Sequence, residues 1–328
     1  MSLPERLGRL QRVERLGVGG FATVWLYHDA ELRSDVAVKA LAENWAQRID
    51  VRERFLEEAR ILRQADSDHI VRVYDIGEVD GTPYFVMTYA DLGSLADVLE
   101  RERRLPVPTV LDLVRQAGAG LSVLHEQGVV HRDIKPQNLL LRSGGSAGPR
   151  LLVADLGVAK AMLHASGLTQ VVGTPAYMAP EQATGIGIDI RADVHALGAV
   201  TYQMLTGALA RDGSIGELLH ATLPPPPSSL ADLPSAVDDV LLRALEPDPE
   251  DRWPDVASYV AALRAALPSQ TPGVQDQLTL WHVPDRTAAD GTALAPPSPG
   301  PLWPTVLISL LTFVAAFALA YVLFTTLR

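Results

Sequence analysis

Eight residues near the middle of the chain read His131-Arg132-Asp133-Ile134-Lys135-Pro136-Gln137-Asn138. A proline and the density of polar groups argue against a helix, so the sequence predicts a loop here. The segment before it predicts a helix, because apolar residues recur at helical spacing and Gly128 stands where the helix should stop. The apolar residues of that segment are Val110, Leu113, Val114, Ala117, Leu121 and Leu124.

Three side chains of the predicted loop can act on one reaction. Asp133 can accept a proton, Lys135 can stabilise developing negative charge, and Asn138 can bind a hard cation through its amide oxygen. Any one of them alone would be an ordinary surface residue, but their combination in one short loop is not typical of a structural connection. The loop is therefore the candidate catalytic segment.

The octapeptide resembles the catalytic loop of protein kinases, whose pattern is H-R-D-x-K-x-x-N. The resemblance implies that Asp133 is the catalytic base, that Lys135 assists the transfer, and that Asn138 binds Mg²⁺ or Mn²⁺. Lysine at position 135, rather than the arginine-containing variant typical of tyrosine kinases, favours serine or threonine as the acceptor.

A glycine-rich segment near the N-terminus, residues 16–24, approximates the kinase pattern G-x-G-x-x-G-x-V, with Ala22 in the third glycine position. Glycines let backbone N–H groups approach phosphates, although the pattern alone is also typical of an ordinary β-turn. The apolar strand at residues 35–39 follows and resembles the V-A-I-K strand, whose lysine binds ATP phosphates. The resemblance implies an ATP site that includes Leu16, Gly17, Gly19, Gly20, Val24, Ala37 and Lys39.

Residues 51–64 predict a helix with one apolar face, which Glu58 borders. A carboxylate in that position needs a partner. By resemblance to the helix of the kinase N-lobe the partner is Lys39, and the alternative is a glutamate at a solvated edge. The residues on the apolar face are Val51, Phe55, Ala59 and Leu62.

Residues 71–76 and 84–89 alternate like β-strands, with Asp80-Gly81 between them as a hairpin turn. The second strand resembles the last N-lobe strand of kinases and the hinge that hydrogen-bonds adenine. Met87 then lies at the back of the ATP pocket and Tyr89 lies in the hinge. Thr88 stands where the family often has glutamate, which we expect to matter little because hinge contacts are mainly made by the backbone.

Residues 139–142 and 150–154 predict two strands around a glycine-rich turn, and Asp155-Leu156-Gly157 follows them. This tripeptide resembles the kinase D-F-G motif with leucine in place of phenylalanine. The resemblance implies that Asp155 binds Mg²⁺ together with Asn138 and that the ion bridges the β- and γ-phosphates.

Residues 158–181 correspond by resemblance to the activation segment, and their last nine match the G-T-x-x-Y-x-A-P-E form of serine/threonine kinases. Ser166 and Thr169 are candidate phosphosites that can pair with Arg132, and the alternative is that they are ordinary loop hydroxyls. The resemblance also pairs Glu181 with Arg252.

Residues 193–198 resemble the start of the central C-lobe helix. The family usually has an aromatic residue at position 195, where this chain has histidine. We therefore expect His195 to be packed and neutral rather than catalytic.

The composition narrows the class of protein. A net charge of −11 without a basic stripe argues against nucleic acid as a partner, and the absence of cysteine excludes disulfides and thiolate metal sites. The charged N-terminus lacks the apolar core of a signal peptide.

The C-terminal part of the chain has a different composition. Residues 268–304 are rich in proline and lack periodicity, which predicts a flexible linker. Residues 305–327 contain no charge over 23 positions, and at 1.5 Å per residue they span about 34 Å, enough for a hydrocarbon layer of ~30 Å. We expect a single membrane-spanning helix with only Arg328 beyond it, and a cytoplasmic kinase domain at the cell membrane.

Together these patterns predict an α+β, bilobal protein-kinase-like fold at residues 13–267, after an N-terminal extension at residues 1–12. The resemblance is to bacterial eukaryotic-like serine/threonine kinases, and it implies ATP and protein substrates. Because a membrane helix would concentrate two copies in one plane, we also expect a homodimer that phosphorylates itself in trans. Two alternatives remain, which are a membrane-anchored pseudokinase scaffold, suggested by Ala22 and Leu156, and a small-molecule phosphotransferase. The docking segment at residues 173–181 argues against the second.

Overall fold

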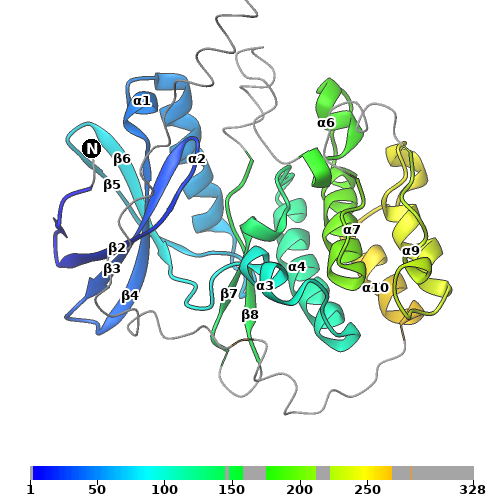
Figure 1. The fold of residues 1–328 in the computed structure, drawn as a ribbon. Coiled ribbons are helices and arrows are strands. Elements are labelled where there is room, and N and C mark those ends of the chain that lie inside the picture. Colours follow the sequence, from blue (N-terminus) through cyan, green and yellow to red (C-terminus); the bar gives the residue numbers. More distant parts are fainter. Residues whose placement is uncertain (1–2, 145–147, 158–174, 212–221, 268–280, 282–328) are drawn as a thin grey trace, which may run out of the picture. The chain divides into compact units, whose positions relative to one another are not determined.

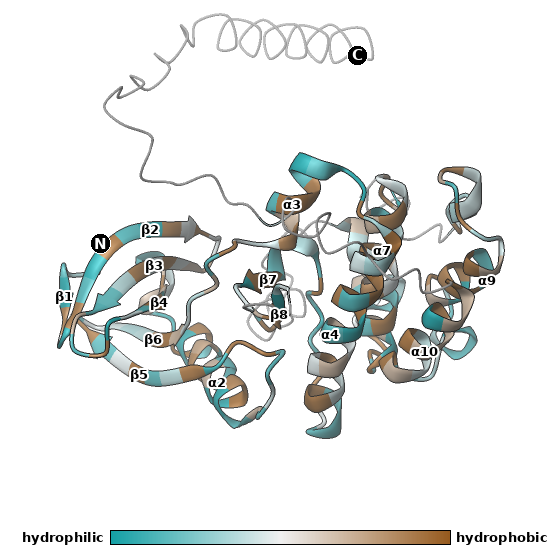
Figure 2. Cartoon of the chain, turned by 90° about the horizontal axis from the view of Figure 1, so that it is seen from below, coloured by the Kyte–Doolittle hydropathy of each residue, from teal (hydrophilic) through white to brown (hydrophobic). Residues whose placement is uncertain are grey.

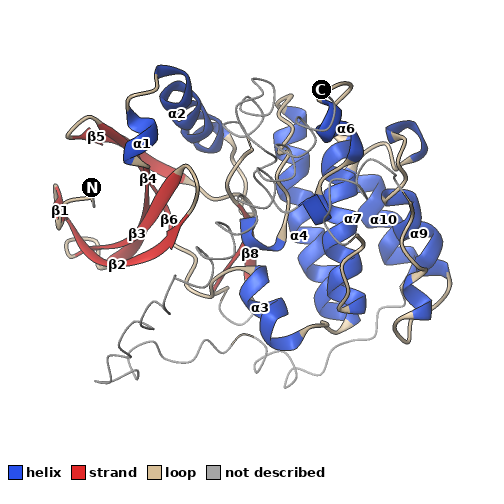
Figure 3. Cartoon of the chain, turned by 45° about the horizontal axis from the view of Figure 1, so that its top comes forward, coloured by secondary structure: helices blue, strands red, loops and turns tan. Residues whose placement is uncertain are grey.

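The computed structural model describes residues 3–144, 148–157, 175–211, 222–267 and 281. A β-rich N-terminal lobe precedes a mainly helical C-terminal lobe (Figures 1 and 3), which confirms the expected bilobal α+β architecture. Among the described residues, no helix is long and apolar enough to cross a membrane. The expected linker at 268–304 and the expected spanning helix at 305–327 lie outside the described residues.

The N-terminal lobe contains six strands and two helices. They are β1 (Arg6–Leu7), β2 (Leu10–Val18), β3 (Ala22–Asp29), β4 (Ser34–Leu41), α1 (Glu43–Ala46), α2 (Ile49–Gln64), β5 (Val73–Val79) and β6 (Thr82–Thr88). The described part of the C-terminal lobe contains two strands, β7 (Leu139–Arg142) and β8 (Arg150–Val153), and the helices α3 (Leu95–Glu102), α4 (Val107–Glu126), α6 (Pro180–Thr184), α7 (Arg191–Thr206), α9 (Ala236–Ala244) and α10 (Val256–Ala266). Four 3-10 turns lie between them, at Pro136–Asn138, Pro175–Tyr177, Pro227–Ser229 and Pro249–Asp251.

The N-terminal sheet has the strand order β1-β2-β3-β4-β6-β5, and all its pairs are antiparallel. The register sets Val24 opposite Lys39 and Ala37 opposite Met87. The turn between β5 and β6 is Asp80-Gly81, whose φ angles of 49° and 76° are both positive, as a tight hairpin turn requires. The hairpin expected from this dipeptide is therefore present.

Residues 3–12, which we expected to precede the kinase domain, join the N-terminal lobe. β1 and β2 extend the sheet, and Leu3 and Leu7 are buried on one of its faces. There they form a small second core with Tyr27, Val38 and Val86.

One face of α2 packs into the main core of the protein. Its buried residues include Glu58 and the four apolar residues that the helical wheel selected. Phe55 contacts Phe85 of the sheet with ring centroids 5.0 Å apart. The sequence therefore predicted the buried face of α2 correctly.

Helix α7 forms the centre of the C-terminal lobe. Nearly all of its residues are buried, as expected for a helix covered on all sides by other elements. Figure 2 shows apolar residues on α7 and on its neighbour α4. Gly198 lets α9 approach closely, because a Cβ at this position would lie 2.8 Å from Cβ of Ala244.

His195 on α7 is fully buried, as expected. Burial, assisted by the positive charges of Arg211 and Arg252, lowers its pKa well below the ordinary value of 6.5. In the unfolded chain His195 takes up a proton near pH 6.5, whereas in the folded chain it stays neutral. The free energy of unfolding therefore falls as the pH falls below that value.

We predict that His195→Phe makes the free energy of unfolding less dependent on pH. Between pH 7.5 and pH 5.5 the free energy of unfolding of the wild type should fall by about 1.4 kcal/mol more than that of the variant. This difference corresponds to one extra proton bound by the unfolded chain over one pH unit. Urea unfolding at the two pH values measures this difference, and any packing change caused by Phe cancels from it. Equal losses in both proteins would show that His195 takes up its proton without unfolding.

Candidate functional site

Lys39 links the two lobes through ion pairs. Its ammonium lies 2.8 Å from Glu58 Oε1 on α2 and 2.9 Å from Asp155 Oδ1, which follows β8. Burial alone would lower the pKa of Lys39, but the carboxylates of Asp155 and Glu58 outweigh burial and raise it. The lysine therefore stays charged, and the predicted pairing with Glu58 is present.

The glycine-rich segment connects β2 to β3. Gly19 N–H donates to the carbonyl of Ala22 at 2.8 Å, which closes the turn. A Cβ at Gly17 or Gly20 would meet nothing within 4 Å, so the protein's own packing does not require glycine at these positions. The space without side chains is suited to a phosphate held by backbone N–H groups.

Five apolar or aromatic residues expected in the ATP site share one apolar cluster. Ala37 and Met87 are buried in the main core, and the partly buried side chains of Leu16, Val24 and Tyr89 pack against it. The structure thus gathers residues from β2, β3, β4, β6 and the following hinge, as the resemblance implied.

Thr88, at the hinge position where glutamate is frequent, is buried. Its hydroxyl lies 3.1 Å from that of Tyr74 and accepts from Arg72 N–H at 3.3 Å, while its own N–H donates to the carbonyl of Arg72 at 2.9 Å. Threonine therefore anchors the end of β6 to the start of β5.

The three predicted polar residues of the catalytic loop converge. Lys135 Nζ lies 3.1 and 3.2 Å from the two carboxylate oxygens of Asp133. Asn138 Nδ2 donates to Asp133 Oδ2 at 2.8 Å and to the Asp133 carbonyl at 2.7 Å. Because Nδ2 of Asn138 is directed at Asp133, Oδ1 of Asn138 points away from Asp133.

Asn138 and Asp155 are suited to a Mg²⁺ or Mn²⁺ ion. Asn138 Nδ2 lies 3.5 Å from the carbonyl of Asp155, so the two residues are neighbours. Within the described ranges, no three acidic, histidine or cysteine side chains form a cluster that could hold a metal ion. The carboxylate of Asp155 and the amide of Asn138 suit the coordination of Mg²⁺, which binds few protein ligands and completes its coordination shell with water and substrate phosphates.

Asp193, at the start of α7, holds the catalytic loop, a role that the sequence analysis missed. Its Oδ1 accepts from Arg132 N–H and its Oδ2 from His131 N–H, both at 2.8 Å. His125 Nε2 donates to the same Oδ2 at 2.8 Å. Arg132 has a φ of 65°, which is unfavourable for a side chain with a Cβ, and these bonds hold it there. The available sequence signal was an acidic residue at the start of a largely apolar helix.

His131 is a structural histidine. Its Nε2–H donates to the carbonyl of Ala154 at 3.0 Å, and its Nδ1 accepts from Asp133 N–H at 3.3 Å. One ring nitrogen donates and the other accepts, so the ring is neutral. Burial lowers its pKa in agreement with this arrangement.

The Asp155-Leu156-Gly157 motif packs directly on the catalytic loop. Leu156 is buried, and Gly157 N–H donates to the carbonyl of His131 at 2.9 Å. A Cβ at Gly157 would lie 3.0 Å from that carbonyl oxygen and 3.3 Å from Asp133 Cβ. A side chain here would force the backbone of the catalytic loop to move by a few tenths of an ångström, so glycine allows the close approach.

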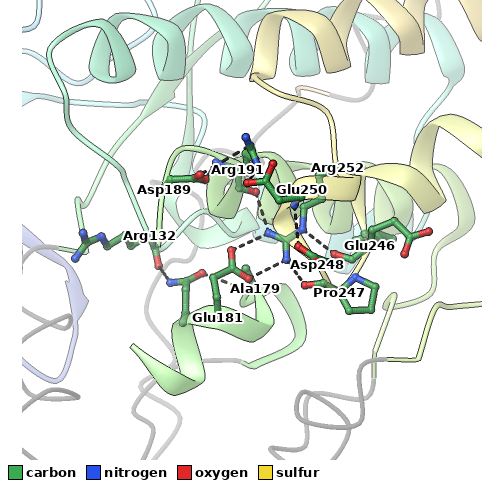
Figure 4. Close-up of polar contacts among 12 residues, drawn as sticks. Arg132, Ala179, Glu181, Asp189, Arg191, Glu246, Pro247, Asp248, Glu250 and Arg252 are labelled. Atoms are coloured by element: carbon green, nitrogen blue, oxygen red, sulfur yellow. Dashed lines mark hydrogen bonds and ion pairs between the residues drawn. The ribbon is translucent and has the colours of Figure 1, made fainter. Parts of the chain in front are cut away.

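Glu181 and Arg252 form the predicted ion pair, which is bidentate with N–O distances of 2.7 and 2.8 Å (Figure 4). Arg252 is fully buried and also donates to the carbonyls of Glu246 and Pro247. The expected phosphosites, Ser166 and Thr169, lie outside the described residues.

Comparison with known proteins agrees with this site. Residues 10–257 match the protein kinase domain family. The chain is 38% identical over 271 residues to serine/threonine-protein kinase Pkn1 of Myxococcus xanthus, covering 80% of this chain and 39% of Pkn1. It is 34% identical over 319 residues to serine/threonine-protein kinase PknJ of Mycobacterium tuberculosis, covering 89% of this chain and 53% of PknJ.

The crystal structure of the PknI kinase domain of Mycobacterium tuberculosis is also similar. The TM-score is 0.64 at 28% identity, and the alignment covers 81% of this chain and all of that domain. The chain spans between 39% and 58% of the length of Pkn1, PknJ and the other curated relatives that it matches.

We predict that Arg252→Met destabilises the protein strongly, because it leaves the Glu181 carboxylate buried without its partner. The free energy of unfolding should fall by about 3–5 kcal/mol. The double variant Glu181→Gln/Arg252→Met should recover part of that loss in a urea-unfolding cycle. Arg48→Met, which breaks an exposed pair with Asp50, is the control and should cause no measurable change. Additive losses in the cycle would contradict a coupled pair.

Proposed function

This chain belongs to the protein kinase family, among the bacterial eukaryotic-like serine/threonine kinases, and we propose that it transfers the γ-phosphoryl group of ATP to serine and threonine hydroxyls of proteins. The observation that carries the proposal is the convergence of Lys39, Asp133, Asn138 and Asp155 at hydrogen-bonding distances. These residues come from separate segments of the chain, and a fold alone would not require their chemistry.

Each side chain has a role in the transfer. Asp133 orients the acceptor hydroxyl and takes its proton, the hydroxyl oxygen bonds to the γ-phosphorus, and the bond between that phosphorus and the leaving ADP oxygen breaks. Lys135, 3.1 Å from Asp133, stabilises the negative charge of the transferred group. Lys39, fixed by Glu58, binds the α- and β-phosphates. A Mg²⁺ or Mn²⁺ ion bound by Asn138 and Asp155 would neutralise phosphate charge.

The pseudokinase alternative lacks support from the described site. With alanine at position 22, the glycine-rich turn is still closed, because Gly19 N–H donates to the carbonyl of Ala22. Leu156, which replaces the phenylalanine of the D-F-G motif, is buried. Neither departure removes a group that the chemistry needs. The small-molecule alternative remains opposed by the docking segment at residues 173–181, which resembles that of protein kinases.

We predict that Asp133→Asn lowers kcat for phosphoryl transfer by about 10²- to 10⁴-fold, because the amide cannot accept the proton. The KM for ATP should stay close to the wild-type value, whereas Lys39→Met should raise it. Kinetics with a generic peptide and Mg²⁺–ATP measure both effects. Near-full transfer by Asp133→Asn would show that another group is the base.

The same preparations report on self-phosphorylation, which we include in the proposal because two copies in one membrane are concentrated in a plane. Mass spectrometry of wild type should find phosphate on Ser166, Thr169 or both, and none on Asp133→Asn. Arg132, which is exposed, is available to bind such a phosphate. A homodimer acting in trans and a signalling role follow from this part of the proposal.

Membrane attachment is a further part of the proposal. Residues 305–327 would span the cell membrane after the proline-rich linker, and the kinase domain would be cytoplasmic because ATP is there. The support is the uncharged 23-residue sequence itself.

We predict that full-length protein stays with membranes through a carbonate or high-salt wash, since apolar burial does not respond to charge screening. The control is a truncation after His282, which keeps Trp281, a partly buried residue that packs against the core. The truncated form should be released into the soluble fraction and keep its kcat. Release of the full-length protein by the wash would rule out a spanning helix.

A further inference from the structure

We propose that Gln182 is a positioning residue that ties the end of the substrate-docking segment to the peptide group before the catalytic aspartate. The inference rests on the proposed function, because it assigns Gln182 a role in the same transfer reaction. Gln182 touches neither Lys39, Asn138 nor Asp155, and it acts through two backbone contacts.

Gln182 lies in the first turn of α6, where its side chain bridges two separate segments. Nε2 donates to the carbonyl of Arg132 at 2.8 Å, and Oε1 accepts from Ala179 N–H at 3.1 Å. Figure 4 labels the two backbone ends of this bridge, Arg132 and Ala179, close to the Glu181–Arg252 pair. The amide donates on one side and accepts on the other, so both of its polar atoms are used.

The Arg132 end of the bridge controls the orientation of Asp133. The carbonyl of Arg132 and the N–H of Asp133 belong to one planar peptide group. The N–H of that group contacts His131 Nδ1 at 3.3 Å, and Arg132 N–H is held by Asp193 at 2.8 Å. Gln182 supplies the remaining restraint, at the carbonyl, and thereby fixes the plane from which the Asp133 side chain projects.

The Ala179 end of the bridge belongs to the docking segment. Ala179 is fully buried, and the preceding turn is fixed by a bond from Met178 N–H to the carbonyl of Pro175 at 3.0 Å. Tyr177 OH donates to Gln203 of α7 at 2.6 Å. A displacement of the docking segment is therefore transmitted to Asp133 through the side-chain amide of Gln182.

Two variants separate the two contacts of Gln182. Gln182→Glu keeps an oxygen for Ala179 N–H but has no N–H for the carbonyl of Arg132, whereas Gln182→Met loses both bonds at similar length. We expect kcat to fall about five- to tenfold in both, as for the loss of one hydrogen bond. The KM for a peptide substrate should rise only in Gln182→Met. The KM for ATP should stay at the wild-type value in both, and the melting temperature should fall by only a few degrees, as for the loss of one or two hydrogen bonds.

Two further measurements complete the design. Gln11→Glu and Gln11→Met on β2, at an exposed position, are the matched controls and should leave every parameter unchanged. Hydrogen exchange of the Ala179 amide does not depend on activity, and it should be faster in Gln182→Met but not in Gln182→Glu.

The outcomes distinguish this proposal from the proposed function. If wild type transfers no phosphate, the function fails, and the exchange rate at Ala179 still decides whether Gln182 holds the docking-segment end of the bridge. If wild type is active and Gln182→Met keeps its kcat and peptide KM, the proposal is overturned. A loss of activity that comes with a raised ATP KM and unfolding at the assay temperature would also overturn it, because that pattern indicates a general structural role.

Discussion

The catalytic centre depends on one buried carboxylate that binds backbone N–H groups. Asp193 is fully buried and accepts from the N–H groups of His131 and Arg132 and from the ring of His125. A buried charge is costly unless hydrogen bonds satisfy it, so the carboxylate requires the loop to take one conformation. Because α7 is packed on all sides, its residue Asp193 has a fixed position, and its hydrogen bonds fix a loop from another part of the sequence.

The same principle joins the remaining parts of the site. Lys39 and Asp155 are 116 positions apart in the chain, and their ion pair joins the sheet of one lobe to the loop that follows β8 of the other. Gly157 then packs against the loop that Asp193 holds, so closely that a Cβ at position 157 would lie 3.0 Å from the carbonyl oxygen of His131. Asp133, Asn138, Asp155 and Lys39, to which we assign the steps of the proposed transfer, thus form one connected set in which a shift of any member disturbs the others.

The parts of the structure that local patterns determine could be predicted from the sequence. The helical wheel of α2 selected the residues that are buried, and the strand expected at 139–142 has those limits in the structure. The pairs Lys39–Glu58 and Glu181–Arg252 followed from motifs with known spacing. Neither the role of Asp193 nor that of Gln182 could be predicted in this way, because each depends on contacts between segments about 50 to 60 residues apart. The burial of Leu3 and Leu7 was missed for another reason, since two leucines in a charged segment have no periodicity.

The arrangement around Lys39 also has a consequence for the electrostatic selection of the nucleotide. The ammonium groups of Lys39 and Lys135 lie among three carboxylates, those of Glu58, Asp133 and Asp155. The local balance is negative, and the chain as a whole carries a net charge of −11. A free nucleotide triphosphate is strongly anionic and would be repelled from such a surface, whereas a triphosphate already paired with divalent cations would not. In the proposed reaction, the protein's own charges would therefore favour the metal-bound form of the nucleotide over the metal-free form.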